Sequence, residues 1–247
     1  MTNDNSKQSE PRLNIPEKVE ISPQSDDRFA ADLRGFGLLG ILAIVVIILS
    51  GNIFLDNVLV PVGAVLVLLW VRRSHTPWRE IGYVRPRSWI GSLVVGLIFG
   101  ITFKFLMKAI VMPLLGADAI NQPYHYLVGN SAALPAAVWT MTVAGFAEET
   151  LYRGFLFERF GKIFGTGAWA KTLIVLLTSI LFALSHYVNL GLPGVEQAMI
   201  TGLVFGTIYA VTGRIFMLMI AHAAFDLTAV AIIYWNAEST VAHFVFK

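Results

Sequence analysis

The stretch IFMLMIAHAAFDLTAVAIIYW, residues 215–235, carries a single charged side chain, Asp226. A helix that spans a bilayer needs about 20 mostly apolar residues, and this stretch meets that requirement. Comparable apolar stretches occupy residues 36–55, 58–71, 89–112, 132–157, 168–187 and 195–212. The sequence therefore predicts an all-α fold, a polytopic membrane helix bundle of about seven transmembrane helices in contact with the lipid bilayer.

Composition leads to the same fold class. Charged residues make up 14% of the chain, against about 25% in soluble domains. Residues 1–34 hold 12 of the 34 charged side chains, which predicts a disordered polar N-terminal tail and an integral membrane domain over 35–247. A net charge of +2 is too small to suggest a nucleic-acid partner. The absence of cysteine excludes thiolate nucleophiles and Cys-ligated zinc.

Basic residues predict the orientation. The loop 72–88 carries five arginines, whereas 113–131 has no Lys or Arg, and short cytoplasmic loops collect basic residues. No removable signal peptide is recognisable at the start. We expect an integral protein of the cell (plasma or inner) membrane with a cytoplasmic N-terminus.

Ionisable residues inside the apolar stretches are the candidates for function, because a charge at the centre of a membrane helix costs on the order of 2.5–3.5 kcal/mol. They occur in the segments AEETLYRG (147–154), FALSH (182–186) and HAAFD (222–226). On a helix Arg153 shares a face with Glu149, four residues earlier, whereas Glu148 is turned away by roughly 100°. Each cluster alone also fits a structural role, such as an interfacial ion pair or a packed histidine.

One shared polar cavity would explain all three clusters. A carboxylate beside an imidazole can hold and deprotonate water, and a second histidine can donate to an oxyanion. Hydrolysis of an amide bond within the membrane is therefore the favoured chemistry. Upright helices, however, would place Glu148 roughly 18 Å, His186 roughly 27 Å and His222 about 10 Å from the cytoplasmic ends of their spans. Tilt, a re-entrant segment or different helix boundaries must bring them together.

The ordered motifs EExxxR, FxxxH and HxxxD, over a motif core of residues 132–230, resemble those of the CPBP intramembrane proteases. This family, also called ABI, contains type II CAAX prenyl endopeptidases and bacteriocin-processing or self-immunity proteins. The resemblance implies that Glu148 activates water and that His186 helps to hold it. It assigns the oxyanion to His222 and Asp226, and supporting roles to Glu149 and Arg153. Its last motif often ends in Asn, so the Asp at 226 needs a proton to donate in the same way.

The resemblance also leaves two mechanisms open. The family is usually described as metalloproteases, in which case Glu148, His186 and His222 would be the ligands of a Zn²⁺ ion with water in the fourth position. A metal-independent mechanism that relies on glutamate alone is the other reading. Either implies an intramembrane endopeptidase acting on a peptide or protein substrate, of CAAX type or of leader or bacteriocin type.

The alternative is a polytopic protein without enzymatic activity, either an immunity or scaffold protein or a proton-coupled transporter. A serine protease would depend on Ser131 in a loop, which is disfavoured. Lys104 and Lys108 lie one helical turn apart in the span 89–112. We expect both to extend to the outer interface, with an entrance for a peptide carboxylate as the less favoured reading.

Overall fold

The computed structural model describes residues 28–35, 37, 40, 42 and 58–246. Helices account for all regular structure in this described part, which confirms the all-α membrane bundle. The elements are α1 (Arg28–Gly35), α3 (Leu59–Arg73), η1 (Trp78–Ile81), α4 (Trp89–Leu106), η2 (Met107–Val111), α5 (Met112–Leu114), η3 (Gln122–Leu127), α6 (Leu134–Glu149), η4 (Thr150–Leu156), α7 (Phe157–Phe164), α8 (Ala168–Ser185), α9 (Tyr187–Thr212), α10 (Phe216–Tyr234) and α11 (Glu238–Ala242).

Six of the seven expected spans are helical, and the expected span 36–55 lies largely outside the described residues. Four of the six have bounds within two residues of those predicted, whereas α9 begins at Tyr187, before the predicted 195, and the run that starts with α6 continues to Phe164, past the predicted 157. In the described part of the chain, four helical segments are long and apolar enough to cross a membrane: Trp89–Leu114, Ala168–Ser185, Tyr187–Thr212 and Phe216–Tyr234. Helix α3 has 15 residues, fewer than a full crossing needs. The run from α6 through η4 to α7 is continuous, and its middle contains the buried pair Glu149 and Arg153.

The predicted tail is helical where the structure describes it. Residues 28–35 form α1, so the expected disorder does not extend to them, and residues 1–27 lie outside the described part. The carbonyl oxygens at the end of α1 accept hydrogen bonds from the bundle: Trp70 Nε1 donates to Leu33 O at 2.9 Å and Arg159 Nη1 donates to Arg34 O at 2.9 Å. These donors satisfy carbonyls that a helix end leaves unpaired, which the local sequence does not reveal.

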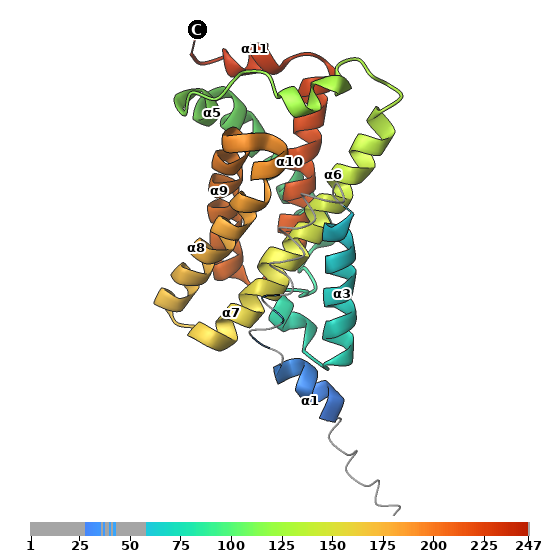
Figure 1. Ribbon diagram of the computed structural model, residues 1–247, viewed down its shortest axis with the longest axis vertical. Helices are drawn as coiled ribbons and strands as arrows, with labels where there is room; N and C mark the ends of the chain where they lie inside the picture. Colours follow the sequence, from blue (N-terminus) through green and yellow to red (C-terminus); the bar gives the residue numbers. More distant parts are fainter. Residues whose placement is uncertain (1–27, 36, 38–39, 41, 43–57, 247) are drawn as a thin grey trace, which may run out of the picture.

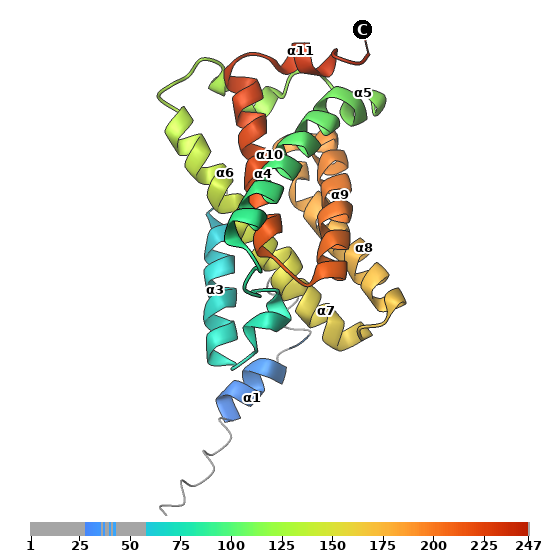
Figure 2. The same ribbon diagram turned by 180° about the vertical axis from the view of Figure 1, so that it is seen from behind.

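Helix α10 packs against α4 on one side and α6 on the other, as Figure 2 shows for α4. Glycines permit this close approach. A Cβ added to Gly100 would lie 2.1 Å from the Ala221 carbonyl oxygen, and one added to Gly145 would lie 2.7 Å from the Ala223 nitrogen. Both contacts flank His222, so the glycines set the position of that imidazole. Gly96 on α4 also lies close to α10, since a Cβ added there would lie 2.9 Å from the Met217 carbonyl oxygen.

Two departures from upright helices resolve the depth mismatch expected from the sequence. Helices α6 to α8 run obliquely through the bundle (Figure 1). Helix α10 does not begin at the end of the bundle that carries α1, because the backbone N–H of Ile215 donates to Gly82 O at 3.0 Å in the arginine-rich loop. That loop folds beneath the start of α10 and raises His222 toward the middle of the molecule.

The end of the bundle that carries α1 lies opposite the end that carries α11 (Figures 1 and 2). Large apolar side chains cover the outer faces between these ends, among them Ile90, Ile98 and Leu184, which are 75%, 62% and 49% exposed. Such an apolar surface suits lipid rather than water. The cytoplasmic N-terminus stays a prediction.

We predict that Gly100→Ala destabilises the bundle by about 1–3 kcal/mol, because the added methyl group meets the backbone of α10 and overpacks the contact. The apparent melting temperature of the purified protein in detergent measures this effect. Gly161→Ala is the matched control, since a Cβ there has no neighbour within 4 Å. Equal melting temperatures for the two variants would contradict the packing described.

Candidate active site

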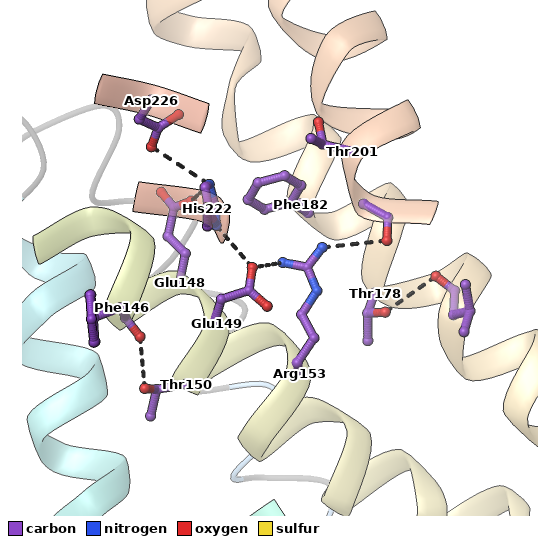
Figure 3. A network of polar contacts seen from close by, with 12 residues as sticks. Phe146, Glu148, Glu149, Thr150, Arg153, Thr178, Phe182, Thr201, His222 and Asp226 are labelled. Atoms are coloured by element: carbon purple, nitrogen blue, oxygen red, sulfur yellow. Dashed lines mark hydrogen bonds and ion pairs between the residues drawn. The ribbon is translucent and has the colours of Figure 1, made fainter. Parts of the chain in front are cut away.

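A network of buried polar side chains joins α6, η4, α9 and α10 (Figure 3). Arg153 Nη1 donates to Glu149 Oε1 at 2.8 Å, which confirms the pair predicted from their spacing. The same carboxylate oxygen accepts from His222 Nδ1 at 2.9 Å. Arg153 also reaches the backbone of α9 through Nη2 and Gly202 O at 3.4 Å. One carboxylate therefore fixes side chains from two helices.

Glu149 and Arg153 are almost inaccessible, at 0% and 1% exposure. The guanidinium lies between two aromatic rings, with its carbon 4.9 Å from the Phe182 centroid and 5.6 Å from the Phe205 centroid. These rings offer the cation favourable faces and keep water away. Glu149 and Arg153 thus lie behind the site, where they hold His222 in place.

Glu148 points in a different direction from its neighbour, as the helical geometry predicts. Its Oε2 lies 3.5 Å from His222 Nε2, and its side chain is 16% exposed. Asp226 Oδ2 lies 3.7 Å from the same nitrogen. The imidazole of His222 therefore has Glu149 on one side and two further carboxylates on the other (Figure 3).

His186, which follows the last residue of α8, is the second predicted histidine of the site. Its Nδ1 lies 2.8 Å from the Phe182 carbonyl oxygen. Because a carbonyl only accepts, Nδ1 carries the proton, and the neutral ring keeps a lone pair on Nε2. The Phe182 ring packs against both histidines, with centroid distances of 4.7 Å to His186 and 5.7 Å to His222.

A cavity of about 110 Å³ collects these groups; we call it the inner cavity. Glu148, His186 and Asp226 all line it, although they come from three different helical segments. His222 contacts Glu148 and Asp226 from behind. The gathering of the three sequence clusters around one polar cavity is therefore present in the structure.

Sequence reasoning missed other members of the lining. Tyr152, Ser185, Asn189 and Gln197 face the inner cavity, but none belongs to a pair of ionisable residues. Tyr152 lies four residues after Glu148 and three before Phe155, a spacing that could have suggested the same helical face. Tyr152 and Arg153 lie in η4, a π-helical segment directly after the glutamates, and π turns occur frequently at functional sites.

The expectation that Lys104 and Lys108 extend to the outer interface is wrong. Lys104 is 7% exposed and donates to Gln197 Oε1 at 2.9 Å. Lys108 Nζ lies 3.6 Å from Glu238 Oε1, a buried carboxylate. Both lysines turn into the protein, where polar partners from α9 and α11 contact their ammonium groups.

Glu148, His186 and His222 are the residues that the resemblance implies as ligands if a Zn²⁺ ion is bound. Among the described residues, no group of three or more His, Asp or Glu side chains is arranged to hold a metal ion. His222 Nδ1 is engaged by Glu149, which leaves only Nε2 available. The side chains as placed do not fit a three-ligand zinc site in the described part of the chain.

An all-α membrane protein with a buried cavity of Glu, His and Asp side chains is thus defined by fold and site together. Residues 130–228 match the family model of the type II CAAX prenyl endopeptidase, Rce1-like. The predicted resemblance is confirmed as a match: it begins and ends within two residues of the predicted motif core, 132–230. No curated protein and no solved structure matches the chain. The family supports an intramembrane endopeptidase with a peptide or protein substrate.

We predict that Arg153→Met destabilises the fold by about 3–5 kcal/mol, because it leaves the Glu149 carboxylate buried without its cation. The double variant Glu149→Gln/Arg153→Met removes both charges and should recover much of this loss. Melting temperature and yield from membranes measure both variants. A single variant as stable as the wild type would contradict the support role of the pair.

Proposed function

We propose that this protein is an intramembrane endopeptidase in which Glu148 acts as the general base on a water molecule in the inner cavity. The observation that carries the proposal is the placement of Glu148. It lines the cavity together with His186, and none of the Lys and Arg side chains in the described part of the chain pairs with it within 4 Å. A largely buried carboxylate without a Lys or Arg partner is suited to take a proton.

In this mechanism water lies between Glu148 and His186. Glu148 takes a proton from water while the water oxygen forms a bond to the carbonyl carbon of the substrate. His186 Nε2 accepts the second hydrogen bond from this water and orients it. The C–N bond then breaks, and the departing nitrogen receives the proton that Glu148 holds.

The oxyanion formed in this step needs hydrogen-bond donors. We assign this role to His222 Nε2–H, with both ring nitrogens protonated, since Nδ1 donates to Glu149 and Nε2 faces two carboxylates. Asp226 contributes a second donor when its carboxyl group is protonated. Glu149 and Arg153 support the imidazole and do not touch the substrate.

We predict that Glu148→Gln lowers the cleavage rate by at least about 100-fold, the usual contribution of a general base, while the protein accumulates in the membrane at wild-type levels. His186→Ala should also abolish cleavage. A fluorogenic peptide library, offered to the purified protein in detergent, provides the assay. Glu80→Gln is the control. Glu80 Oε2 lies 3.7 Å from Lys162 Nζ, at the end of α7 that is remote from Glu148. Full activity of either site variant would refute its assigned role.

The same library separates the two mechanisms that the sequence leaves open. The metal-independent mechanism predicts that a strong chelator leaves the rate of the purified protein within about twofold, since Glu148 alone deprotonates the water. Loss of activity with the chelator, and its recovery on adding Zn²⁺, would instead establish a metalloprotease.

A further inference from the structure

The two ends of the bundle differ in charge. The end that carries α1 also carries the loop 72–88, the turn between α7 and α8 and the start of α10 (Figures 1 and 2). The exposed basic side chains of this end are Arg34, Arg72, Arg73, Arg79, Arg85, Arg87, Lys162 and Lys171. At the α11 end, the segments 113–131, 186–196 and 235–246 contain no Lys or Arg and carry the acidic residues Asp118, Glu196 and Glu238. The described part of the molecule is therefore basic at one end and acidic at the other.

The five arginines of the loop 72–88 are not used inside the protein. All five are exposed, and none of them forms an ion pair within 4 Å with another described residue. Arg159, at the same end, is by contrast buried and bonds to Glu158. Trp78 and Trp89 in and beside the loop are 45% and 52% exposed, as is typical of tryptophans at a membrane–water interface. The loop thus presents unpaired positive charge at a membrane surface.

The cavities open at the acidic end. Beside the inner cavity lies a second cavity of about 290 Å³, lined by α11 and by the exposed residues Asp118, Gln122 and Pro123. A third cavity, of about 660 Å³, includes the exposed ring of Tyr126 and shares these residues with the inner cavity: Tyr124, Thr140, Met141 and Asn189. Residues of 72–88, 157–171 and 210–216 line none of these three cavities. A substrate therefore reaches the inner cavity from the α11 end.

The basic end is closed by packing. The loop 72–88 lies against η4 and α9, since a Cβ added to Gly154 would lie 3.3 Å from the Ile81 carbonyl oxygen and one added to Gly82 would lie 2.5 Å from the Tyr209 ring. Leu151, two residues after the glutamates, is 0% exposed. Atoms in such direct contact leave no passage for a peptide from this side.

Short loops rich in Lys and Arg stay on the cytoplasmic side of a membrane. We propose that the α1 end is cytoplasmic and that the α11 end faces the opposite, trans side, so that the protein cleaves polypeptide segments that have already crossed the bilayer. The substrate is thus a translocated segment of a membrane-anchored or exported polypeptide. This inference rests on the proposed function, because the inner cavity must be the place where the peptide bond is cleaved.

The opposite orientation makes a different prediction. With the α11 end in the cytoplasm, the cavity would receive chains that have not been exported. The five unpaired arginines of the loop 72–88 would then lie on the trans side, against the usual distribution of charge in membrane proteins. The side on which the protein is labelled, and the side on which it cleaves, therefore separate the two.

The first test uses cysteine labelling, because the chain has no cysteine and a single introduced thiol reports its own side. Thr240→Cys on α11 and Thr166→Cys between α7 and α8 are matched variants, since both threonines are exposed and neither lines the three cavities. In spheroplasts of a bacterial expression host, we expect a membrane-impermeant maleimide to label Thr240→Cys. Thr166→Cys should be labelled only after the membrane is permeabilised. Melting temperatures in detergent confirm that both variants are folded.

The second test measures the side of cleavage. The best-cleaved library peptide carries a charged dye that cannot cross lipid, so in sealed membrane vesicles it reaches only the outer face. We expect cleavage by right-side-out vesicles, which expose the trans side, and loss of cleavage in inverted vesicles until detergent opens them. Vesicles with Glu148→Gln in place of the wild type give the background from other proteases.

The outcomes are distinguishable. Labelling of Thr166→Cys but not of Thr240→Cys in intact spheroplasts, or equal labelling of both, would overturn the proposed orientation and leave the protease assignment intact. Cleavage confined to inverted vesicles would overturn the assignment of translocated substrates. Absence of any cleavage that depends on Glu148, even in detergent, would instead refute the proposed function, and the labelling would then decide the orientation by itself.

Discussion

The arrangement of this bundle depends on one buried carboxylate, Glu149, which no water reaches. A charge in such a low-dielectric setting persists only where several donors neutralise it. Glu149 Oε1 accepts from Arg153 in the next turn of its own helical run and from His222 on α10. The ion pair therefore does more than stabilise one helix: it fixes the distance between α6 and α10 at the depth where the inner cavity begins.

The backbone makes this contact possible. His222 reaches Glu149 because α10 approaches α6 at Gly145 and α4 at Gly100, where a side chain of any size would collide with the backbone of α10. Small residues serve this purpose in membrane helices, since close backbone approach supplies the van der Waals contact that replaces the hydrophobic effect. Packing on both sides of α10 and the ion network in its middle are thus parts of one constraint.

Much of this could be predicted from the sequence, because the physics involved is local. Apolar runs of bilayer length predict the membrane helices, and the spacing of Glu149 and Arg153 predicts their ion pair. The confirmed family match covers the same segment as the motifs. The depth of His222 in the bundle could not be predicted, because it depends on where α10 begins. A hydrogen bond between Ile215 and Gly82, which lie far apart in the chain, sets the start of α10. The direction of Lys104 was mispredicted for the same reason: its partner Gln197 lies on another helix.

The distribution of charge around the inner cavity explains why its two glutamates differ. Arg153 lies behind the site, between the Phe182 and Phe205 rings, and its charge is taken up by Glu149. Lys104 also lines the inner cavity, where its ammonium group contacts the Gln197 amide and the Phe225 ring. Glu148 forms no ion pair within 4 Å with either cation and lies 3.5 Å from His222 Nε2 instead. Glu149 bonds to Arg153 and to the Nδ1 side of His222, whereas Glu148 lines the cavity and lies on the Nε2 side of the same imidazole. The carboxylate that is open to the cavity is therefore the one without a guanidinium partner.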